Sequence, residues 1–253
     1  MLKLDHATIK FGGLTAVNDL CIEILDGQIF GLIGPNGAGK TTAFNIITGV
    51  YAPTSGKVIF RGEEIQGKRP YYVTGKGISR TYQNINLFRN MTVSDNVMIG
   101  THTRTKSNLI SDVFNTIGKR REEKQAYERC MEILDFMGIA DKSASKAGSL
   151  SYGEQRKLEI ARALAVEPKL LLLDEPAAGM NLTEKDELAD LIWKIRNLGI
   201  TILLVEHNMK LVMNVCEEIC VLNYGKKLAQ GTPSEIQTNP DVIKAYLGGV
   251  THG

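Results

Sequence analysis

A glycine-rich stretch that ends in lysine and threonine could bind phosphate groups. It reads Gly34-Pro35-Asn36-Gly37-Ala38-Gly39-Lys40-Thr41-Thr42 and fits the pattern GxxxxGK followed by Ser or Thr, between an apolar run and a helical pattern. Glycines let the backbone turn tightly, so main-chain N–H groups can surround phosphate oxygens at a helix N-terminus. We expect the stretch to bind a nucleoside triphosphate, with Lys40 at the β- and γ-phosphates and the Thr41 hydroxyl on Mg²⁺. The alternative, a simple glycine turn, would not require the Lys-Thr pair.

Two carboxylates follow the apolar run Leu170–Leu173. Asp174 and Glu175 come directly after the run and before Pro176. A buried strand would deliver Asp174 to the carboxyl edge of a parallel sheet, where ligands bind in open α/β folds. There Asp174 could hold Mg²⁺ and Glu175 could act as general base toward an attacking water. The alternative is a pair of solvent-exposed acids at the end of a strand.

A serine and a glycine open a predicted helix later in the chain. The stretch reads Leu150-Ser151-Tyr152-Gly153-Glu154-Gln155-Arg156. Ser151 and Gly153 at a helix N-terminus could supply a second phosphate contact. An ordinary serine N-cap with a following acid is the alternative.

Two further polar residues follow predicted strands. Gln83 comes after a short strand, and His207 comes after the apolar run Thr201–Val205. His207 should therefore lie at the same sheet edge as Asp174. An isolated histidine such as His6 is more often structural or on the surface, and we expect that of His6.

The elements that must hold these residues alternate between strands and helices. Strands are predicted at 2–9, 21–25, 28–33, 57–60, 170–173 and 201–205, and helices at 41–48, 154–166 and around 188–198. This alternation favours a mostly parallel sheet covered by helices on both faces. Between Val93 and about Ala147, apolar residues recur at helical spacing and charges fill the other positions, which indicates a helical subdomain.

The composition excludes other classes of protein. The net charge of +2 comes without a clustered basic stripe, so we expect no nucleic-acid partner. The cysteines lack the spacing of a metal site, and we expect reduced thiols without metal or disulfide at Cys21, Cys130, Cys216 and Cys220. Residues 1–12 contain no signal-peptide core and no apolar run approaches the roughly 18 residues of a membrane helix. Any membrane role would therefore come through partners.

The order of these motifs resembles that of the nucleotide-binding subunit of ABC transporters. Phosphate loop, glutamine loop, signature, acidic strand and histidine switch follow one another between about Leu2 and Leu247. The resemblance implies an α/β fold: a P-loop NTPase (ABC ATPase) core with a mostly parallel sheet, an antiparallel β subdomain and an inserted helical subdomain. It implies one ATP-binding domain over 1–253, with the core and β subdomain at 1–92 and 148–253 and the helical subdomain at about 93–147.

The resemblance also implies roles for single residues, with ATP and Mg²⁺ as cofactors. Phe11 would stack on adenine, and Gln83 would touch Mg²⁺ or the attacking water. His207 would bond the γ-phosphate and position Glu175. The signature serine and glycine would act in trans, on ATP held by the opposite subunit of a dimer.

Several stretches further resemble the LivG-type ATPases of branched-chain amino acid importers. They are 78–84 with 87–89, 152–156, 174–181, 206–213 and the tail 239–248. The tail is the most telling because no catalytic need dictates it. The resemblance implies an ATPase that powers uptake of branched-chain amino acids through a separate permease.

Four residues depart from the usual pattern of the superfamily. Tyr152 and Glu154 replace Gly and Gln of the signature, and Asn181 and Asn208 stand where Asp is usual. These changes bear on coupling and turnover rate rather than on ATP binding.

The implied partners are a second ABC ATPase subunit of the related LivF type, two transmembrane permease subunits and, indirectly, an extracytoplasmic solute-binding protein. The chain would then lie at the cytoplasmic face of the plasma (inner) membrane. The alternatives are an ATPase for urea or short amides, one for lipopolysaccharide export, a non-transport ABC ATPase, and a small-molecule P-loop kinase. The kinase would need neither the signature nor His207.

Overall fold

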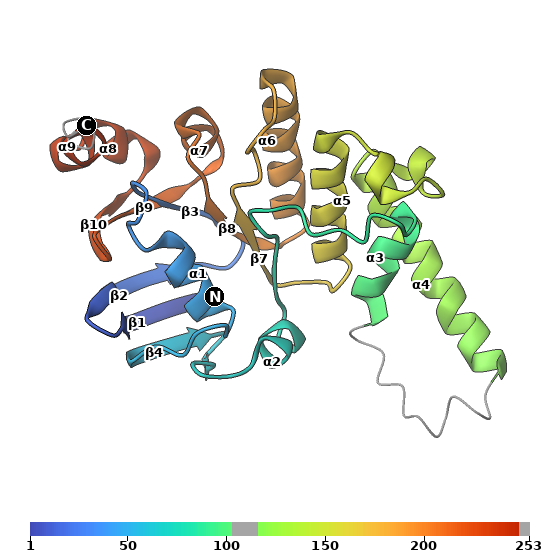
Figure 1. Cartoon of the computed structure of the whole chain (residues 1–253), viewed down its shortest axis with the longest axis horizontal. Helices are drawn as coiled ribbons and strands as arrows, with labels where there is room; N and C mark the ends of the chain where they lie inside the picture. The colour runs from blue at the N-terminus through green and yellow to red at the C-terminus, as the bar shows by residue number, and fades with distance from the viewer. Residues whose placement is uncertain (103–115, 248–253) are drawn as a thin grey trace. The chain divides into compact units, whose positions relative to one another are not determined.

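The structure is a computed structural model that describes residues 1–102 and 116–247 (Figure 1). The chain divides into two compact units, Met1–Arg80 with Lys169–Gly253, and Thr81–Pro168. The second unit is wider than the helical subdomain expected at about 93–147, because α5 (Tyr152–Leu164) packs with its helices. Part of that expected range, 103–115, lies outside the described residues.

The first unit contains a six-stranded sheet of order β10-β9-β3-β8-β7-β6. Its strands are β3 (Ile29–Ile33), β6 (Ile78–Arg80), β7 (Leu170–Asp174), β8 (Thr201–Val205), β9 (Glu218–Asn223) and β10 (Lys226–Gly231). All neighbours pair in parallel except β10, which joins β9 antiparallel. Every residue of β3, β7 and β8 is buried, as expected for central parallel strands. The predicted mostly parallel sheet is confirmed.

Helices of the first unit lie between its strands or, for the last two, after β10. They are α1 (Lys40–Ile47), α2 (Pro70–Gly75), α6 (Leu182–Asn197), α7 (Met209–Val215), α8 (Pro233–Thr238) and α9 (Pro240–Leu247). The start of α6 shows why one of them forms where it does. The Asn181 side chain accepts the Glu184 N–H at 3.0 Å, and the Glu184 carboxylate accepts the Asn181 N–H at 2.8 Å. This capping box satisfies backbone donors that a helix start leaves without partners.

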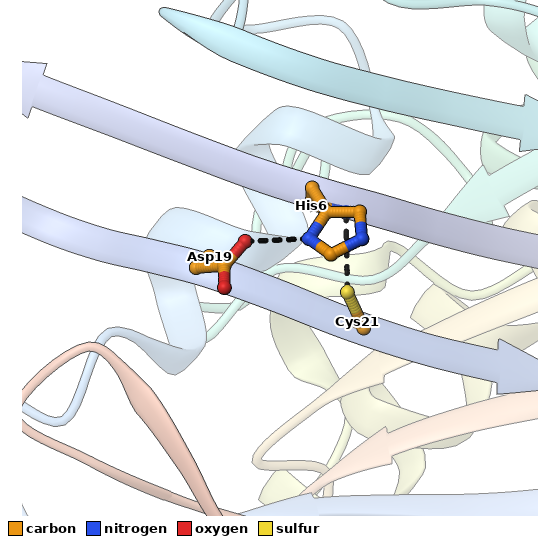
Figure 2. Close-up of side chains that lie close together, drawn as sticks. All are labelled: His6, Asp19 and Cys21. Carbon is orange, nitrogen blue, oxygen red and sulfur yellow. Dashed lines mark hydrogen bonds and ion pairs between the residues drawn. The ribbon is translucent and has the colours of Figure 1, made fainter.

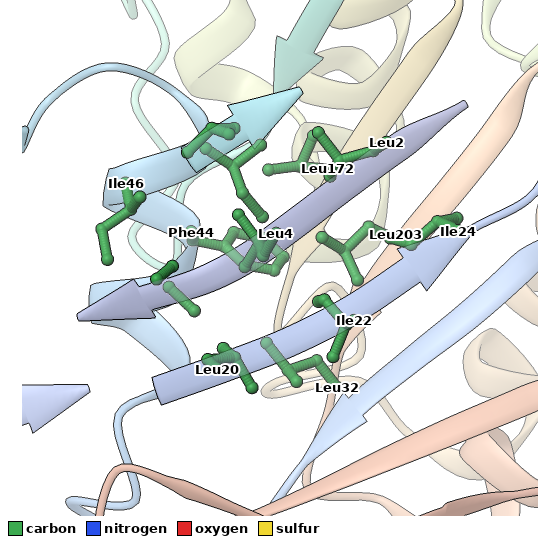
Figure 3. Close-up of a cluster of buried hydrophobic side chains, with 14 of the residues drawn as sticks. Leu2, Leu4, Leu20, Ile22, Ile24, Leu32, Phe44, Ile46, Leu172 and Leu203 are labelled. Carbon is green, nitrogen blue, oxygen red and sulfur yellow. The ribbon is translucent and has the colours of Figure 1, made fainter. Parts of the chain in front are cut away.

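A four-stranded sheet of order β2-β1-β4-β5 completes the first unit. Its strands are β1 (Leu2–Phe11), β2 (Leu14–Ile24), β4 (Ser55–Phe60) and β5 (Glu63–Glu64), and all pair antiparallel. Leu4 and Ile22 face Phe44 of α1 and Leu203 of β8 in the buried cluster that Figure 3 shows. The predicted antiparallel β subdomain is therefore confirmed, and its inner face shares one core with the parallel sheet.

The second unit is helical. It consists of α3 (Val93–His102), α4 (Thr116–Phe136) and α5, with short 3-10 turns at Ala140–Lys142 and Ala147–Ser149. In the two described stretches of the chain, none of the helices combines the length and hydropathy that crossing a bilayer requires.

The shared core predicts a stability experiment. Leu203→Ala removes a fully buried side chain between the two sheets and should lower the free energy of unfolding by about 2–5 kcal/mol. Leu198→Ala is the matched control because Leu198 is 61% exposed, and its effect should stay within about 0.5 kcal/mol. Urea unfolding followed by circular dichroism measures both, and equal effects would contradict the placement of the core.

Candidate functional site

The phosphate loop connects β3 to α1, and two of its glycines are required by close backbone contacts. Gly34 has a φ of 151°, and a Cβ there would lie 2.2 Å from the Leu222 carbonyl oxygen. Gly39 has a φ of 103°, and its Cβ would lie 2.6 Å from the Ala16 carbonyl oxygen. The loop is thus held between β9 and β2, where a side chain would clash.

Lys40, the first residue of α1, turns back over this loop. Its side chain is buried, and Nζ donates hydrogen bonds to the carbonyl oxygens of Gly34 at 2.7 Å and Pro35 at 3.0 Å. Burial lowers the pKa of Lys40, while the negative charges of Glu175 and Asp174 act in the opposite direction. The ammonium group and the two carboxylates therefore lie within electrostatic reach of one another.

Glu175 and His207 meet just past the ends of neighbouring strands. The N–H of Glu175 donates to the Val205 carbonyl at 2.8 Å, and Glu175 has the left-handed φ of 48°. Its Oε1 lies 2.7 Å from His207 Nε2, and the two side chains are 18% and 42% exposed. The carboxylate is therefore oriented by His207 and partly accessible to solvent, as a general base requires.

Asp174 ends β7 with a buried side chain. Its Oδ2 lies 3.4 Å from Arg80 Nη2, and Arg80 Nη1 donates to Asn45 Oδ1 at 2.9 Å. Arg80 thus links the acidic strand end to α1. Arg80 was not predicted as a site residue, because one arginine after Ser79 in a short strand is a weak signal in the sequence.

Glu206 is another residue that the motif-based prediction missed. It is buried, and its Oε1 accepts the Ala177 N–H at 2.7 Å. Its Oε2 accepts the N–H groups of His207 at 2.9 Å and Asn208 at 3.0 Å. One carboxylate therefore fixes the loops after β7 and β8, the two loops that carry Glu175 and His207.

Phe11 and Thr41 are both exposed, and the contacts of their side chains do not by themselves indicate nucleotide or metal binding. The Phe11 ring, at the end of β1, is 44% exposed and meets Tyr51 edge-on at 5.2 Å between ring centroids. The exposed ring remains free to stack on a planar base. Thr41 in α1 is exposed, and Thr42 is half-buried.

The other predicted site residues belong to the second unit. The Ser151 hydroxyl caps α5 by accepting the Glu154 N–H at 3.4 Å, and the Glu154 carboxylate accepts the Ser151 N–H at 2.8 Å. Gly153 is buried in the first turn of α5. Gln83 has an exposed side chain.

Arg156 joins these two predicted motifs within the second unit. Its side chain is fully buried and pairs with Glu159 at 2.7 Å. Its guanidinium donates to the carbonyl oxygens of Tyr82 at 2.9 Å and Gln83 at 3.1 Å. The glutamine segment is therefore anchored to the helix that begins with Ser151. The sequence did not predict this buried contact, because an arginine within a helical pattern is usually exposed.

The C-terminal helix α9 contacts the phosphate loop. The backbone N–H of Gly34 donates a hydrogen bond to the Tyr246 hydroxyl, and burial raises the pKa of this phenol to about 12. On the opposite face of α9, Asp241 and Lys244 line a cavity of about 740 Å³ together with loop residues 35–38. Sequence analysis singled out this tail but could not place it beside the loop.

Two family models match parts of the chain. The family model described as ABC transporter matches residues 17–178. A second model, described as Branched-chain amino acid ATP-binding cassette transporter, matches residues 226–252. The second match contains α8, α9 and the Tyr246 contact.

Individual proteins match over nearly the whole chain. The high-affinity branched-chain amino acid transport ATP-binding protein BraF of Pseudomonas aeruginosa is 46% identical, over 98% of both chains. The protein LivG of Escherichia coli (strain K12), described in the same terms, is 45% identical with the same coverage. A crystal structure of the ADP conformation of MJ1267, an ATP-binding cassette of an ABC transporter, is 31% identical with a TM-score of 0.86 over 98% of both chains.

The contact between Tyr246 and Gly34 predicts an effect on nucleotide binding. Tyr246→Phe removes the acceptor of the Gly34 N–H, and one net hydrogen bond is worth about 1 kcal/mol. The phosphate loop should become less ordered, and a loss of about 1 kcal/mol corresponds to an ATP affinity that is about fivefold lower. Tyr224→Phe is the control because Tyr224 is 86% exposed. Titration with a fluorescent ATP analogue measures both variants, and unchanged affinity in Tyr246→Phe would show that α9 does not support the loop.

Proposed function

Because the chain belongs to the ABC transporter family of ATP-binding proteins, we propose that it hydrolyses ATP to drive the import of branched-chain amino acids through a separate permease. The cargo is supported by the relatives named for it, which are 45–46% identical over 98% of the chain. It is also supported by the match of residues 226–252 to the branched-chain family model.

The observation that carries the hydrolytic mechanism is the 2.7 Å contact between His207 and Glu175. With its proton on Nε2, His207 orients the Glu175 carboxylate. Glu175 takes the proton of the water that attacks the γ-phosphate. Lys40 Nζ would leave the carbonyl oxygens that it binds in this structure and compensate the charge that develops on the phosphate oxygens.

The nucleotide would lie on the backbone N–H groups of the phosphate loop, with adenine on the exposed ring of Phe11. Thr41, Asp174 and Gln83 would hold Mg²⁺, because each offers the oxygen ligand that this ion prefers. Bound there, Mg²⁺ would neutralise charge on the β- and γ-phosphates. Arg80 keeps the Asp174 carboxylate in place for this role.

The partner ATPase subunit would complete the site. Ser151 and Gly153 would contact ATP held by the facing subunit, a related LivF-type chain. The Ser151 hydroxyl accepts a hydrogen bond in its capping role and can still donate its own proton to a phosphate oxygen. Capping and ATP binding are therefore compatible at this serine.

The membrane partners would be two permease subunits, with an extracytoplasmic binding protein acting through them. The segment from Gln83 to Met91 would contact the permease on the cytoplasmic side of the membrane. Arg156 binds the carbonyl of Gln83, so movement of this segment would reach the helix that carries the signature. This gives a physical path between permease contact and ATP site.

Replacing the proposed general base tests the mechanism. Glu175→Gln keeps the size of the side chain but cannot accept the proton, so ATP turnover should fall about 10²- to 10⁴-fold. ATP binding should remain, and the ATP-bound dimer should persist on size-exclusion chromatography. Glu187→Gln on α6 is the control, because Glu187 is exposed, and its ATP turnover should be unchanged. Near-normal phosphate release by Glu175→Gln would remove Glu175 from its assigned role.

Reconstitution tests the cargo. The chain, copurified with its permease and placed in liposomes with the binding protein, should take up labelled leucine, isoleucine and valine only with ATP. The binding protein with leucine should also raise the rate of phosphate release. Uptake of urea or a short amide instead would assign the alternative cargo, and the failure of any permease to copurify would favour a non-transport ATPase.

A further inference from the structure

Three side chains with metal-binding atoms gather on the antiparallel sheet of the first unit. They are His6 of β1 and Asp19 and Cys21 of β2 (Figure 2). His6 Nδ1 lies 2.7 Å from Asp19 Oδ1, and the backbone N–H of His6 donates to Cys21 Sγ at 3.3 Å. One ligand atom from each residue lies within 4.8 Å of the others. The proposed ATPase mechanism uses none of the three.

Two compensating bulges bring these residues together. Between the pairs Leu4↔Ile22 and Ala7↔Leu20, β1 advances by one residue more than β2. Between Ala7↔Leu20 and Ile9↔Val17, β2 advances by one residue more than β1. The first register therefore returns at Ile9↔Val17, and a further shift follows between Ile9 and Lys10.

His6 and Asp19 occupy these bulges. Both have left-handed backbone conformations, with φ of 53° and 57°. Their side chains project to solvent and are 69% and 68% exposed. The neighbouring strand β4 accommodates the distortion with a glycine, since a Cβ on Gly56 would lie 2.1 Å from the His6 carbonyl oxygen.

The spacing of the cysteines predicted no metal at Cys21, but the cluster forms only in the folded sheet. We propose that His6, Asp19 and Cys21 bind a divalent transition-metal ion of the Zn²⁺ class, with water as the fourth ligand. An imidazole nitrogen, a thiolate and a carboxylate are the ligands that Zn²⁺ takes in proteins. The soft thiolate selects against Mg²⁺ and Ca²⁺, which prefer oxygen donors. Water in the fourth position gives an open site rather than a closed structural one.

The geometry requires only small movements. Tetrahedral Zn²⁺ bond lengths place pairs of ligand atoms ~3.4 to 3.6 Å apart. His6 and Asp19 must separate slightly from 2.7 Å, and Cys21 must approach from within 4.8 Å. His6 and Asp19 are exposed and can shift without disturbing the core. The Cys21 thiol releases its proton to solvent as it becomes a ligand.

The reactivity of the Cys21 thiol provides a specific measure of metal binding. The other cysteines are buried, and burial raises the pKa of Cys130 to about 11 and those of Cys216 and Cys220 to about 12. Thiolates react with thiol reagents, so in the folded chain Cys21 should react first. Metal bound at Cys21 should block that reaction.

The experiment uses the full chain after chelator treatment, with Zn²⁺ or Co²⁺ as the single added metal. One equivalent of Zn²⁺ should slow labelling of Cys21 at least about tenfold, and Co²⁺ should give the absorption of a cobalt–thiolate bond. His6→Asn and Asp19→Asn should each weaken Zn²⁺ affinity by about tenfold or more. Asparagine tolerates the left-handed backbone, so both variants should keep their melting temperature. Asp26→Asn changes an exposed acid in the connection between β2 and β3, and this variant should keep the Zn²⁺ affinity of the unaltered chain.

Two results would overturn the proposal. Labelling of Cys21 that is indifferent to Zn²⁺ would exclude the metal site. Equal protection in the unaltered chain, His6→Asn and Asp19→Asn would show that Zn²⁺ binds Cys21 without the other two residues. Neither result depends on ATP hydrolysis, so the outcome is independent of the proposed function.

Discussion

The parallel pairing of β7 with β8 is the interaction on which the rest of the site depends. Asp174 pairs in register with Val205, and the Glu175 N–H continues the ladder to the Val205 carbonyl. Glu175 and His207 therefore emerge side by side beyond the last paired residues. A slip by one residue would turn alternate side chains to the opposite face and separate the two groups. The fully buried leucines of both strands fix this register.

Side chains that were not predicted as site residues hold several of the loops, and they do so mainly through backbone N–H and C=O groups. Glu206 accepts three N–H groups from the loops that follow β7 and β8. Arg156 donates to two carbonyls of the glutamine segment. Tyr246 accepts the N–H of Gly34. Buried backbone groups must find partners, so such side chains determine which loop conformations persist.

Capping explains why the departures from the usual pattern are compatible with this fold. Asn181 and Asn208 are the N-caps of α6 and α7, where asparagine and aspartate perform almost equally. Glu154 completes the capping box at Ser151 and also pairs with Lys142. The Tyr152 hydroxyl accepts from Arg156 at 3.2 Å, so its ring adds to the anchor of the glutamine segment. Each replacement has a local structural role of its own.

The sequence by itself determined the central strands, the phosphate loop and the sheet edge that carries Asp174, Glu175 and His207. Continuous apolar runs and glycine spacing are local signals, and they translate directly into buried strands and a phosphate-binding turn. Only the tertiary structure decided that Tyr246 reaches Gly34, that Arg156 binds Gln83, and that two bulges bring His6 to Asp19. These contacts join residues far apart in the chain or depend on register, and both are set by packing rather than by local pattern.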